Sequence, residues 1–325
     1  MKRQLLTILG ILCLSLVWSA DDRKEFKEIV EPSPDIAFAD ATVKAICVEN
    51  WDTDKDGELS EAEAAAVSNI GNVFVGNQDI TSFEELRYFT GITTISGFGG
   101  CSKMNSVAIP ANVKGIEKGT FYGCEELTSI EIPDGVESIG EIAFWGCTKL
   151  KSIDIPNSVT TIDTEAFHGC ENLESVVLPN NVKTLNLTFK SCKSLKSIVI
   201  PNSVTTLYKT FLDCSSLSSV ILPSGIKSIG VGTFYSCTSL ESIEIPDGVT
   251  SIEYAAFEGC NELKSVTMRN ETPISISSST FPNRANATLY VPAGAKAAYE
   301  AADYWKEFKE IVEPSPDIAF ADATV

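Results

Sequence analysis

The chain has 325 residues, 44% of them hydrophobic, and its 44 acidic against 25 basic residues give a formal net charge of −19. A field of that sign repels nucleic acid and anionic membranes, and it favours cations or basic partners. The length exceeds that of one ordinary globular core, so we expect either several domains or a core that grows by repetition.

Residues 1–20 have the pattern of a secretory signal peptide. A basic start at Lys2–Arg3 precedes an apolar run over residues 5–18, and the small pair Ser19–Ala20 follows. The run is short for a bilayer span, and no second hydrophobic segment of spanning length occurs. Lipid attachment at Cys13 is the weaker alternative, because the apolar run continues past it. We therefore expect an extracytoplasmic protein, secreted or held at the cell surface.

A segment of twenty residues occurs twice without a change, as Lys24–Val43 and as Lys306–Val325. It contains the stretch Glu-Pro-Ser-Pro, which is typical of an extended linker. We assign residues 21–42 to a linker or module end, and residues 313–325 to the duplicated linker that starts a further module. A truncated tandem array or a gene with a missing remainder explains the repeat, and a functional tail is the alternative.

Residues 43–82 are expected to form an EF-hand-like helix-loop-helix cap, because 52–63 match a twelve-residue calcium loop. Gly57 stands where the loop turns sharply, and helical patterns flank the loop on both sides. Ser60 and Glu63 also form a capping-box pair, which explains those two residues without a metal. The predicted Ca²⁺ ligands are Asp52, Asp54, Asp56, Glu58 (through its carbonyl), Ser60 and Glu63.

Eight cysteines recur every 22 or 23 residues through the middle of the chain. They are Cys101, Cys124, Cys147, Cys170, Cys192, Cys214, Cys237 and Cys260. A fixed period in this range predicts a solenoid of stacked coils, none of which buries its apolar face alone. We therefore expect about eight coils with a parallel sheet over residues 83–292.

Within a coil, the stretch Ser129–Ile132 alternates polar and apolar residues, as a strand with one buried face does. Pro133 stops the strand, and Asp134–Gly135 favours a tight turn. A second apolar stretch follows at Val136 and Ile139, and a phenylalanine then fills the corner before the next cysteine.

The recurring phrase Phe-x-x-Cys-x-x-Leu-x-Ser-Ile-x-Ile-Pro, seen from Phe144 onward, resembles the bacterial BspA-like subclass of leucine-rich repeats. The match runs from Phe98 to Phe281. The resemblance implies a curved parallel-sheet solenoid on a secreted or surface protein, often an adhesin for host matrix proteins such as fibronectin.

The repeat cysteines are expected to be buried and unbridged. An even count in an exported chain invites a disulfide framework. Cysteines on adjacent coils, however, place their Cβ atoms about 5 Å apart, whereas a disulfide needs about 3.8 Å. Zinc is the least favoured reading, because the chain has a single histidine.

The far end of the solenoid repeats the strand-proline phrase once more at residues 288–292. Residues 293–312 are assigned to a C-terminal cap, with an amphipathic helix over 293–308. Its apolar stripe, which we expect to cover the last coil, comprises Tyr299, Ala302, Trp305 and Phe308.

Two columns of outward-facing residues are candidate ligand sites. On the strand face, Val177, Val199 and Ile221 form an apolar patch beside the acidic Glu131 and Asp154. At the corner, the residue after each phenylalanine gives a column that contains Tyr122, Trp145 and His168. These three rings could stack on a sugar or a peptide. Exposed apolar residues are common on any surface, so neither column is assigned from the sequence alone.

The sequence thus predicts a non-enzymatic, calcium-braced solenoid that binds a protein or glycan ligand, with host extracellular matrix as one possible source. A purely structural surface or periplasmic scaffold is the alternative. A glycan hydrolase that uses Glu131 and Asp154 is a distant third, and His168 fits an ordinary surface histidine better than a catalytic one.

Overall fold

The structure, a computed structural model, describes residues 33–313. The predicted signal peptide (1–20), the first part of the linker and the tail 314–325 lie outside this range. From Asp35 onward the described chain forms one compact unit. Its helices are α2 (Ala41–Trp51), α3 (Glu61–Ala66) and α4 (Lys296–Ala301), with short 3-10 helices η2 (Glu84–Tyr88), η3 (Arg284–Asn286) and η4 (Trp305–Glu307). No helix among the described residues is long and apolar enough to cross a membrane.

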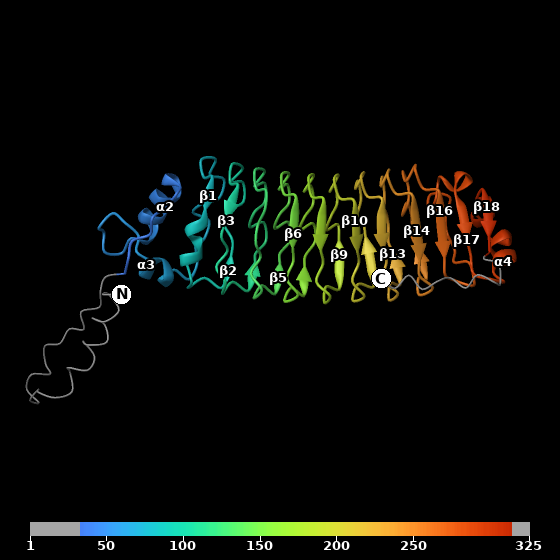
Figure 1. Cartoon of the computed structure of the whole chain (residues 1–325), viewed down its shortest axis with the longest axis horizontal. Coiled ribbons are helices and arrows are strands. Elements are labelled where there is room, and N and C mark those ends of the chain that lie inside the picture. The colour runs from blue at the N-terminus through green and yellow to red at the C-terminus, as the bar shows by residue number, and fades with distance from the viewer. Residues whose placement is uncertain (1–32, 314–325) are drawn as a thin grey trace, which may run out of the picture. The chain divides into compact units, whose positions relative to one another are not determined.

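The strands form two rows, which run side by side along the stack (Figure 1). The first row comprises β1 (Ser82–Phe83), β3 (Ser106–Val107), β6 (Ser152–Asp154), β8 (Ser175–Val177), β10 (Ser197–Val199), β12 (Ser219–Ile221), β14 (Ser242–Ile245), β16 (Ser265–Met268), β17 (Thr288–Tyr290) and β18 (Glu310–Val312). The second row comprises β2 (Thr94–Ile95), β4 (Gly115–Ile116), β5 (Ser138–Ile139), β7 (Thr161–Ile162), β9 (Thr184–Asn186), β11 (Thr206–Tyr208), β13 (Ser228–Ile229) and β15 (Ser251–Ile252).

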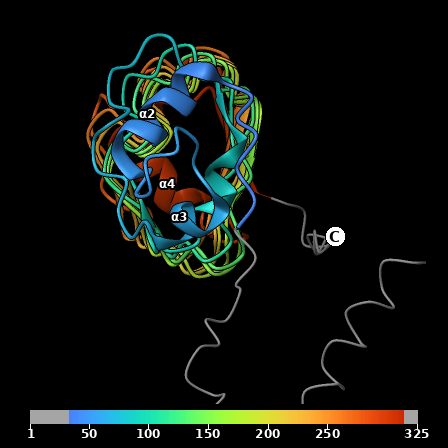
Figure 2. The same cartoon turned by 90° about the vertical axis from the view of Figure 1, so that its left-hand side faces the viewer.

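All strand pairs are parallel and join equivalent residues of neighbouring coils. Asp154 pairs with Val177, and Val199 pairs with Ile221. This register is the consequence of a constant repeat length, because each coil then places the same residue type over its predecessor. Seen along the stack, the coils therefore superimpose (Figure 2).

The parallel-sheet solenoid predicted from the cysteine period is confirmed, and it has about ten turns. Strands β1, β17 and β18 add turns beyond the eight cysteine repeats. Each keeps the buried strand residue (Phe83, Leu289 and Ile311) without the repeat cysteine. One predicted strand does not form: residues 129–132 keep the alternation, with Ile130 and Ile132 buried and Glu131 exposed, but they have no strand geometry.

A continuous stack of phenylalanine rings runs through the core. Neighbouring ring centroids lie 4.6–6.0 Å apart, with nearly parallel planes. The stacked rings belong to Phe74, Phe98, Phe121, Phe144, Phe167, Phe189, Phe211, Phe234, Phe257 and Phe281. Stacking of this kind adds to the free energy gained by burying the rings.

The repeat cysteines form a second ladder beside the phenylalanines. All eight are buried and unbridged, as is Cys47 in α2. Each repeat thiol donates a hydrogen bond to the carbonyl of a phenylalanine in the preceding coil, as from Cys170 Sγ to Phe144 O at 3.2 Å. The other seven bonds are 3.0–3.3 Å long. These carbonyls already accept a backbone N–H, as Phe144 O does from the Cys147 N–H at 3.1 Å, so the thiol adds a second hydrogen bond that joins neighbouring coils.

Asp35–Asp40 is part of the N-terminal cap, which corrects its assignment to the linker. Ile36 is buried, and its N–H donates to Leu59 O at 2.8 Å. Asp40 is the N-cap of α2 and accepts hydrogen bonds from the Thr42 and Val43 N–H groups. Residues 35–40 are therefore held in place by a core side chain, Ile36, and by a helix cap, Asp40.

The single C-terminal helix predicted over 293–308 is also wrong. Helix α4 ends at Ala301, the backbone reverses at Tyr304 with φ of 64°, and η4 leads into β18. Tyr299 and Trp305 are nevertheless buried, as the apolar stripe predicted. Splitting the helix lets both rings cover the last coil, where they meet edge to face with their centroids 5.3 Å apart.

Candidate functional site

The apolar patch on the first row is exposed, as the strand alternation predicted. Val177, Val199 and Ile221 have exposed fractions of 64%, 60% and 59%. The strand register aligns them in one column on consecutive coils, since Val199 pairs with Ile221 and β8 contacts β10. These three residues, hereafter the apolar strip, line a shallow depression together with Ser175, Ser197 and Pro201.

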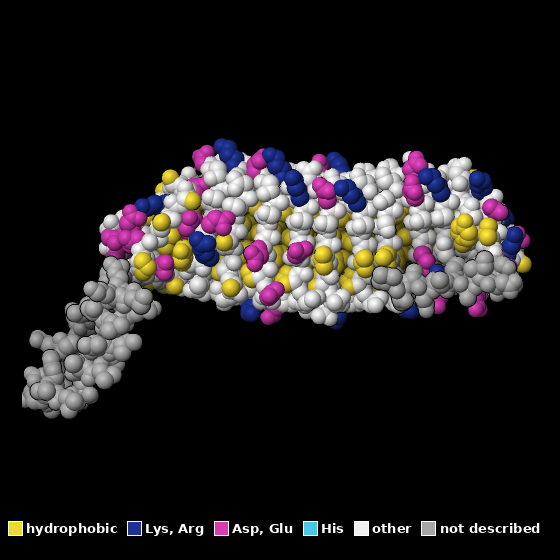
Figure 3. Space-filling model, viewed as in Figure 1, with side chains coloured by type: hydrophobic (Ala, Val, Ile, Leu, Met, Phe, Trp, Pro, Cys, Tyr) yellow, Lys and Arg dark blue, Asp and Glu magenta, His cyan; other side chains and the backbone are white. Residues whose placement is uncertain are grey.

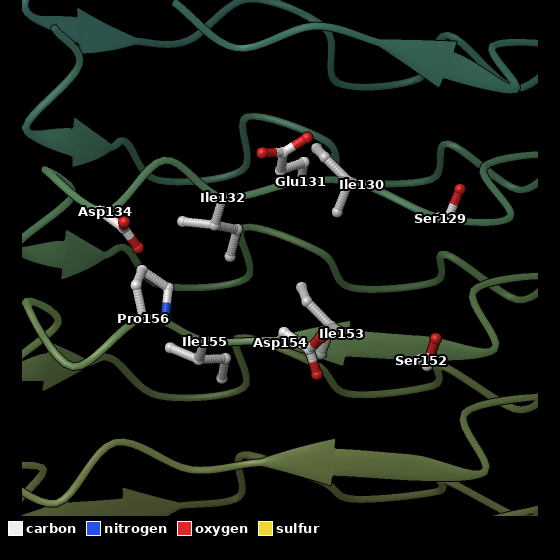
Figure 4. A pocket seen from close by; sticks show the side chains of 10 residues that line it. All are labelled: Ser129, Ile130, Glu131, Ile132, Asp134, Ser152, Ile153, Asp154, Ile155 and Pro156. Carbon is white, nitrogen blue, oxygen red and sulfur yellow. The ribbon is translucent and has the colours of Figure 1, made fainter. Parts of the chain in front are cut away.

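An acidic depression adjoins the apolar strip on the N-terminal side. Its two outward carboxylates are Glu131 and Asp154, and Asp134 lies at its rim. Figure 4 shows the Glu131 and Asp154 carboxylates on neighbouring coils, directed away from each other. Figure 3 shows acidic side chains on this part of the face, next to exposed hydrophobic ones. The two carboxylates do not converge on a common point, as a pair of hydrolytic carboxylates must.

The corner column forms a contiguous aromatic cluster. The Trp145 and His168 rings stack at 4.9 Å with an 8° angle, while the Tyr122 ring stands at 84° to Trp145 at 5.2 Å. Tyr122 is 43% exposed, and with Trp145 it lines a shallow groove beside Gly123 and Gly146. Trp145 and His168 are only partly exposed, so Tyr122 is the ring of this column most open to a ligand.

His168 is the half-buried member of this cluster. Burial chiefly lowers its pKa, Lys190 lowers it further, and Glu165 opposes them. Nδ1 is enclosed, and it lies 3.7 Å from Glu165 Oε1, which is too long for a hydrogen bond. A neutral imidazole that serves as a stacking surface is consistent with this geometry.

The loop 52–63 joins α2 and α3 and brings three of its predicted ligands together. Carboxylate oxygens of Asp52, Asp54 and Glu63 lie within 4.8 Å of one another. Gly57 has φ of 91°, a left-handed conformation that favours glycine. Three converging carboxylates and a sharp glycine turn are a donor set that fits calcium.

The other predicted ligands occupy different positions in the loop. Asp56 stands outside the carboxylate cluster and accepts a hydrogen bond from the Glu58 N–H at 2.8 Å. The Glu58 side chain forms an ion pair with Lys44, which leaves the backbone carbonyl as its expected ligand atom. Ser60 is the N-cap of α3 and completes a capping box with Glu63. The capping box therefore accounts for both residues without a metal.

The carboxyl groups of the loop titrate differently. Hydrogen bonds from Ser60 and Thr53 lower the pKa of Glu63 to about 2. Asp54 receives a hydrogen bond from the Asp56 N–H, but desolvation and its acidic neighbours raise its pKa overall. Repulsion among like charges is relieved by a cation, so the loop is electrostatically suited to one.

Features that the sequence did not single out include an ion-pair ladder along the edge of the coils. Lysines of one coil pair with glutamates of the preceding one, as in Lys149–Glu126 at 2.5 Å and Lys196–Glu174 at 2.7 Å. Tyr208 and Tyr254 are also exposed, beside the second row. The charge alternation at a spacing of 22 or 23 residues was the available signal for the ladder.

Comparison with known proteins identifies the repeats. The model of the BspA type leucine rich repeat region matches residues 94–210 and 186–302. No curated protein matches the sequence. A leucine-rich repeat protein from Bacteroides ovatus is similar in structure, with 29% identity and a TM-score of 0.62 over 80% of this chain. This chain spans 66% of the length of that relative.

A leucine-rich repeat protein of T. pallidum shares 35% identity over 49% of this chain and 78% of its own, with a TM-score of 0.46. The family match covers more than half of the sequence, and the parallel solenoid with its phenylalanine and cysteine ladders accounts for the repeated phrase. The chain belongs to the BspA-type leucine-rich repeat family.

Proposed function

We propose that this protein is an extracytoplasmic, calcium-braced leucine-rich repeat protein that binds a protein ligand on the face of its first strand row. The observation that carries the proposal is the apolar strip, whose three branched side chains are each about 60% exposed. Contiguous exposed apolar surface on a folded protein marks interaction sites more often than isolated residues do. The basic, apolar start of the sequence supports export, and family membership is consistent with a surface location.

A binding role fits the geometry better than a catalytic one. Solenoids of this family present long open surfaces and serve typically as scaffolds or binding modules. The diverging carboxylates of Glu131 and Asp154 give no support to hydrolysis. A purely structural scaffold remains the second candidate, and an outer surface with no ligand would favour it.

Calcium is proposed to brace the N-terminal cap, and the loop geometry supports this role. Leu59, in the middle of the loop, accepts the Ile36 N–H, and Phe38 packs on Phe83 of the first coil at 6.4 Å. An ion held by Asp52, Asp54 and Glu63 would therefore stabilise a loop that is tied directly to the solenoid. The ion is expected to act on stability, since the apolar strip begins several coils away.

A binding screen tests the proposal. The purified chain is assayed against extracellular matrix proteins, fibronectin included, and against a glycan array. For any ligand found, Val199→Lys places a charge in the apolar strip, and Trp145→Ala removes a ring from the corner column.

We expect binding to a protein, its loss in Val199→Lys, and little change with Trp145→Ala. The melting temperature serves as the folding control. It should change by little in Val199→Lys, because exposed substitutions alter stability by no more than about 0.5 kcal/mol, whereas Trp145→Ala also loses ring contacts. A ligand that depends on Trp145 alone would move the site to the corner, and the absence of any ligand would favour the scaffold.

A further inference from the structure

The outward column of the first row changes its chemistry along the stack. Two acidic residues, Glu131 and Asp154, are followed on consecutive coils by the apolar strip. The strand register places Asp154 directly beside Val177, so the acidic depression and the apolar depression share a border. They are therefore two halves of one shallow groove that runs across the strands.

The charge of the groove is one-sided. Among the described residues, neither Glu131 nor Asp154 has an ion-pair partner, whereas the cation Lys196 at the edge of this row is paired with Glu174. At the opposite end, Glu244 forms an ion pair with Arg269 at 2.8 Å. Only the N-terminal half of the groove thus offers uncompensated negative charge.

We propose that this groove binds an extended segment of a partner protein in which Lys or Arg side chains lie at one end and apolar side chains at the other. This inference rests on the proposed function and specifies its ligand. Free carboxylates attract the cations, and the apolar strip gains from burial against branched or aromatic side chains. A second copy of this chain is a poor occupant because its net charge of −19 repels the acidic half.

The distance between neighbouring coils determines how long the bound segment of the partner protein must be. Glu131, Asp154, Val177, Val199 and Ile221 stand on five consecutive coils. At about 4.8 Å per coil the column is about 19 Å long, which an extended chain covers with about six residues. One or two cations followed within about three residues by apolar side chains would match the order of the groove.

A random twelve-residue peptide library displayed on phage tests this proposal directly. It is selected on the wild-type protein, and the enriched peptides are synthesised and measured by fluorescence polarisation at low and high salt. Two variants each alter one half of the groove while keeping the side chains nearly the same shape. Glu131→Gln with Asp154→Asn removes the charges of the acidic half, and Val199→Thr makes the apolar half more polar. The control, Glu117→Gln with Asp163→Asn, removes the same two charges beside the second row.

We expect enriched peptides that combine Lys or Arg with apolar residues in this spacing. Their affinity should fall at least tenfold in the acid-removal variant at low salt, and that difference should shrink at high salt because screening weakens the attraction. Val199→Thr should weaken binding at both salt concentrations. The control should change affinity by less than twofold.

Three results overturn the inference: no enriched peptides, enriched peptides without this pattern, or equal loss in the control variant. If the protein screen yields a ligand that none of these substitutions weakens, the groove proposal fails while a ligand-binding function stands. If neither the protein screen nor the library yields a ligand, both fail.

Discussion

At the scale of single residues, the repeat cysteine has a role that its burial alone does not explain. A valine would fill similar space, but only a thiol both tolerates burial and donates to the phenylalanine carbonyl of the preceding coil. Burial raises the pKa of Cys101 to about 11 and that of Cys260 to about 12. The buried thiols are therefore protonated at neutral pH and unreactive.

Thiol reactivity should reflect this burial. With an aromatic disulfide reagent at neutral pH and no reductant, we expect slow or no reaction of the nine described cysteines in the folded protein. Unfolding in guanidinium should release all nine at once, because the thiolate that reacts forms only after exposure. Mass spectrometry under non-reducing conditions is the check, and intact bridges would contradict the geometry.

Asp40 links the N-terminal cap to the solenoid. Besides capping α2, its carboxylate accepts hydrogen bonds from the Thr81 N–H at 2.8 Å and the Thr81 hydroxyl at 2.9 Å. Asp40→Ala should lower the free energy of unfolding by about 1–3 kcal/mol, from the lost cap and the unpaired Thr81 donor. Urea denaturation measures the change, and Thr42→Ala, which keeps the backbone donor, is a suitable control.

The same residue gives a pH dependence with a defined sign. Burial works to raise the pKa of Asp40, but the hydrogen bonds from Thr81, Val43 and Thr42 lower it below its usual value of 3.8. The stabilisation is therefore present above about pH 4 and is lost as the pH falls through the lowered folded-state pKa. The destabilisation caused by Asp40→Ala should accordingly shrink when it is measured at acid pH.

At the scale of elements, the helix-loop-helix is held by contacts in which the expected ion has no part. The antiparallel bridge between Asp35 and Ser60 ties the loop to the preceding segment, and Trp51 packs against Phe89 at 5.4 Å. The cap is therefore expected to fold without calcium and to become more stable with it.

Calcium should raise the melting temperature of the wild-type chain. An ion that binds only the folded form adds about 2.7 kcal/mol at a hundredfold excess over its dissociation constant. Chelation should reverse the gain, and Asp52→Ala with Glu63→Gln should abolish the response to calcium. Equal melting curves of the wild-type protein with and without calcium would contradict the calcium assignment.

At the scale of the whole stack, stability depends on contacts between neighbouring coils. Each coil meets only its predecessor and its successor, so a defect in the middle interrupts the phenylalanine stack on both sides. Phe189→Ala should cost about 3–5 kcal/mol, because the ring is fully buried between Phe167 and Phe211.

Denaturation followed by circular dichroism tests this prediction. We expect the central substitution to lower the midpoint and also to broaden the transition or split it into two steps. The exposed substitution Tyr254→Ala, in the same type of coil, is the control and should leave the midpoint nearly unchanged. A loss below 1 kcal/mol for Phe189→Ala would mean that the coils are not coupled through this stack.

The sequence by itself determined the parallel solenoid, its buried columns and the exposure of the apolar strip. Because the repeat length is nearly constant, equivalent residues of neighbouring coils pack on one another. The alternation of polar and apolar residues along each strand then determines which side chains face outward. The turn at Gly57 and the capping box of Ser60 and Glu63 were also predictable from the sequence, because both are local features.

Only the tertiary structure decided what happens at the ends and between the coils. Ile36, expected in the linker, is instead buried in the hydrophobic core and donates its N–H to Leu59 O. The predicted C-terminal helix is split because two aromatic rings must cover one coil. The spacing of the acidic and apolar residues was visible in the sequence. The divergence of the Glu131 and Asp154 carboxylates depends on side-chain directions, which no local pattern encodes.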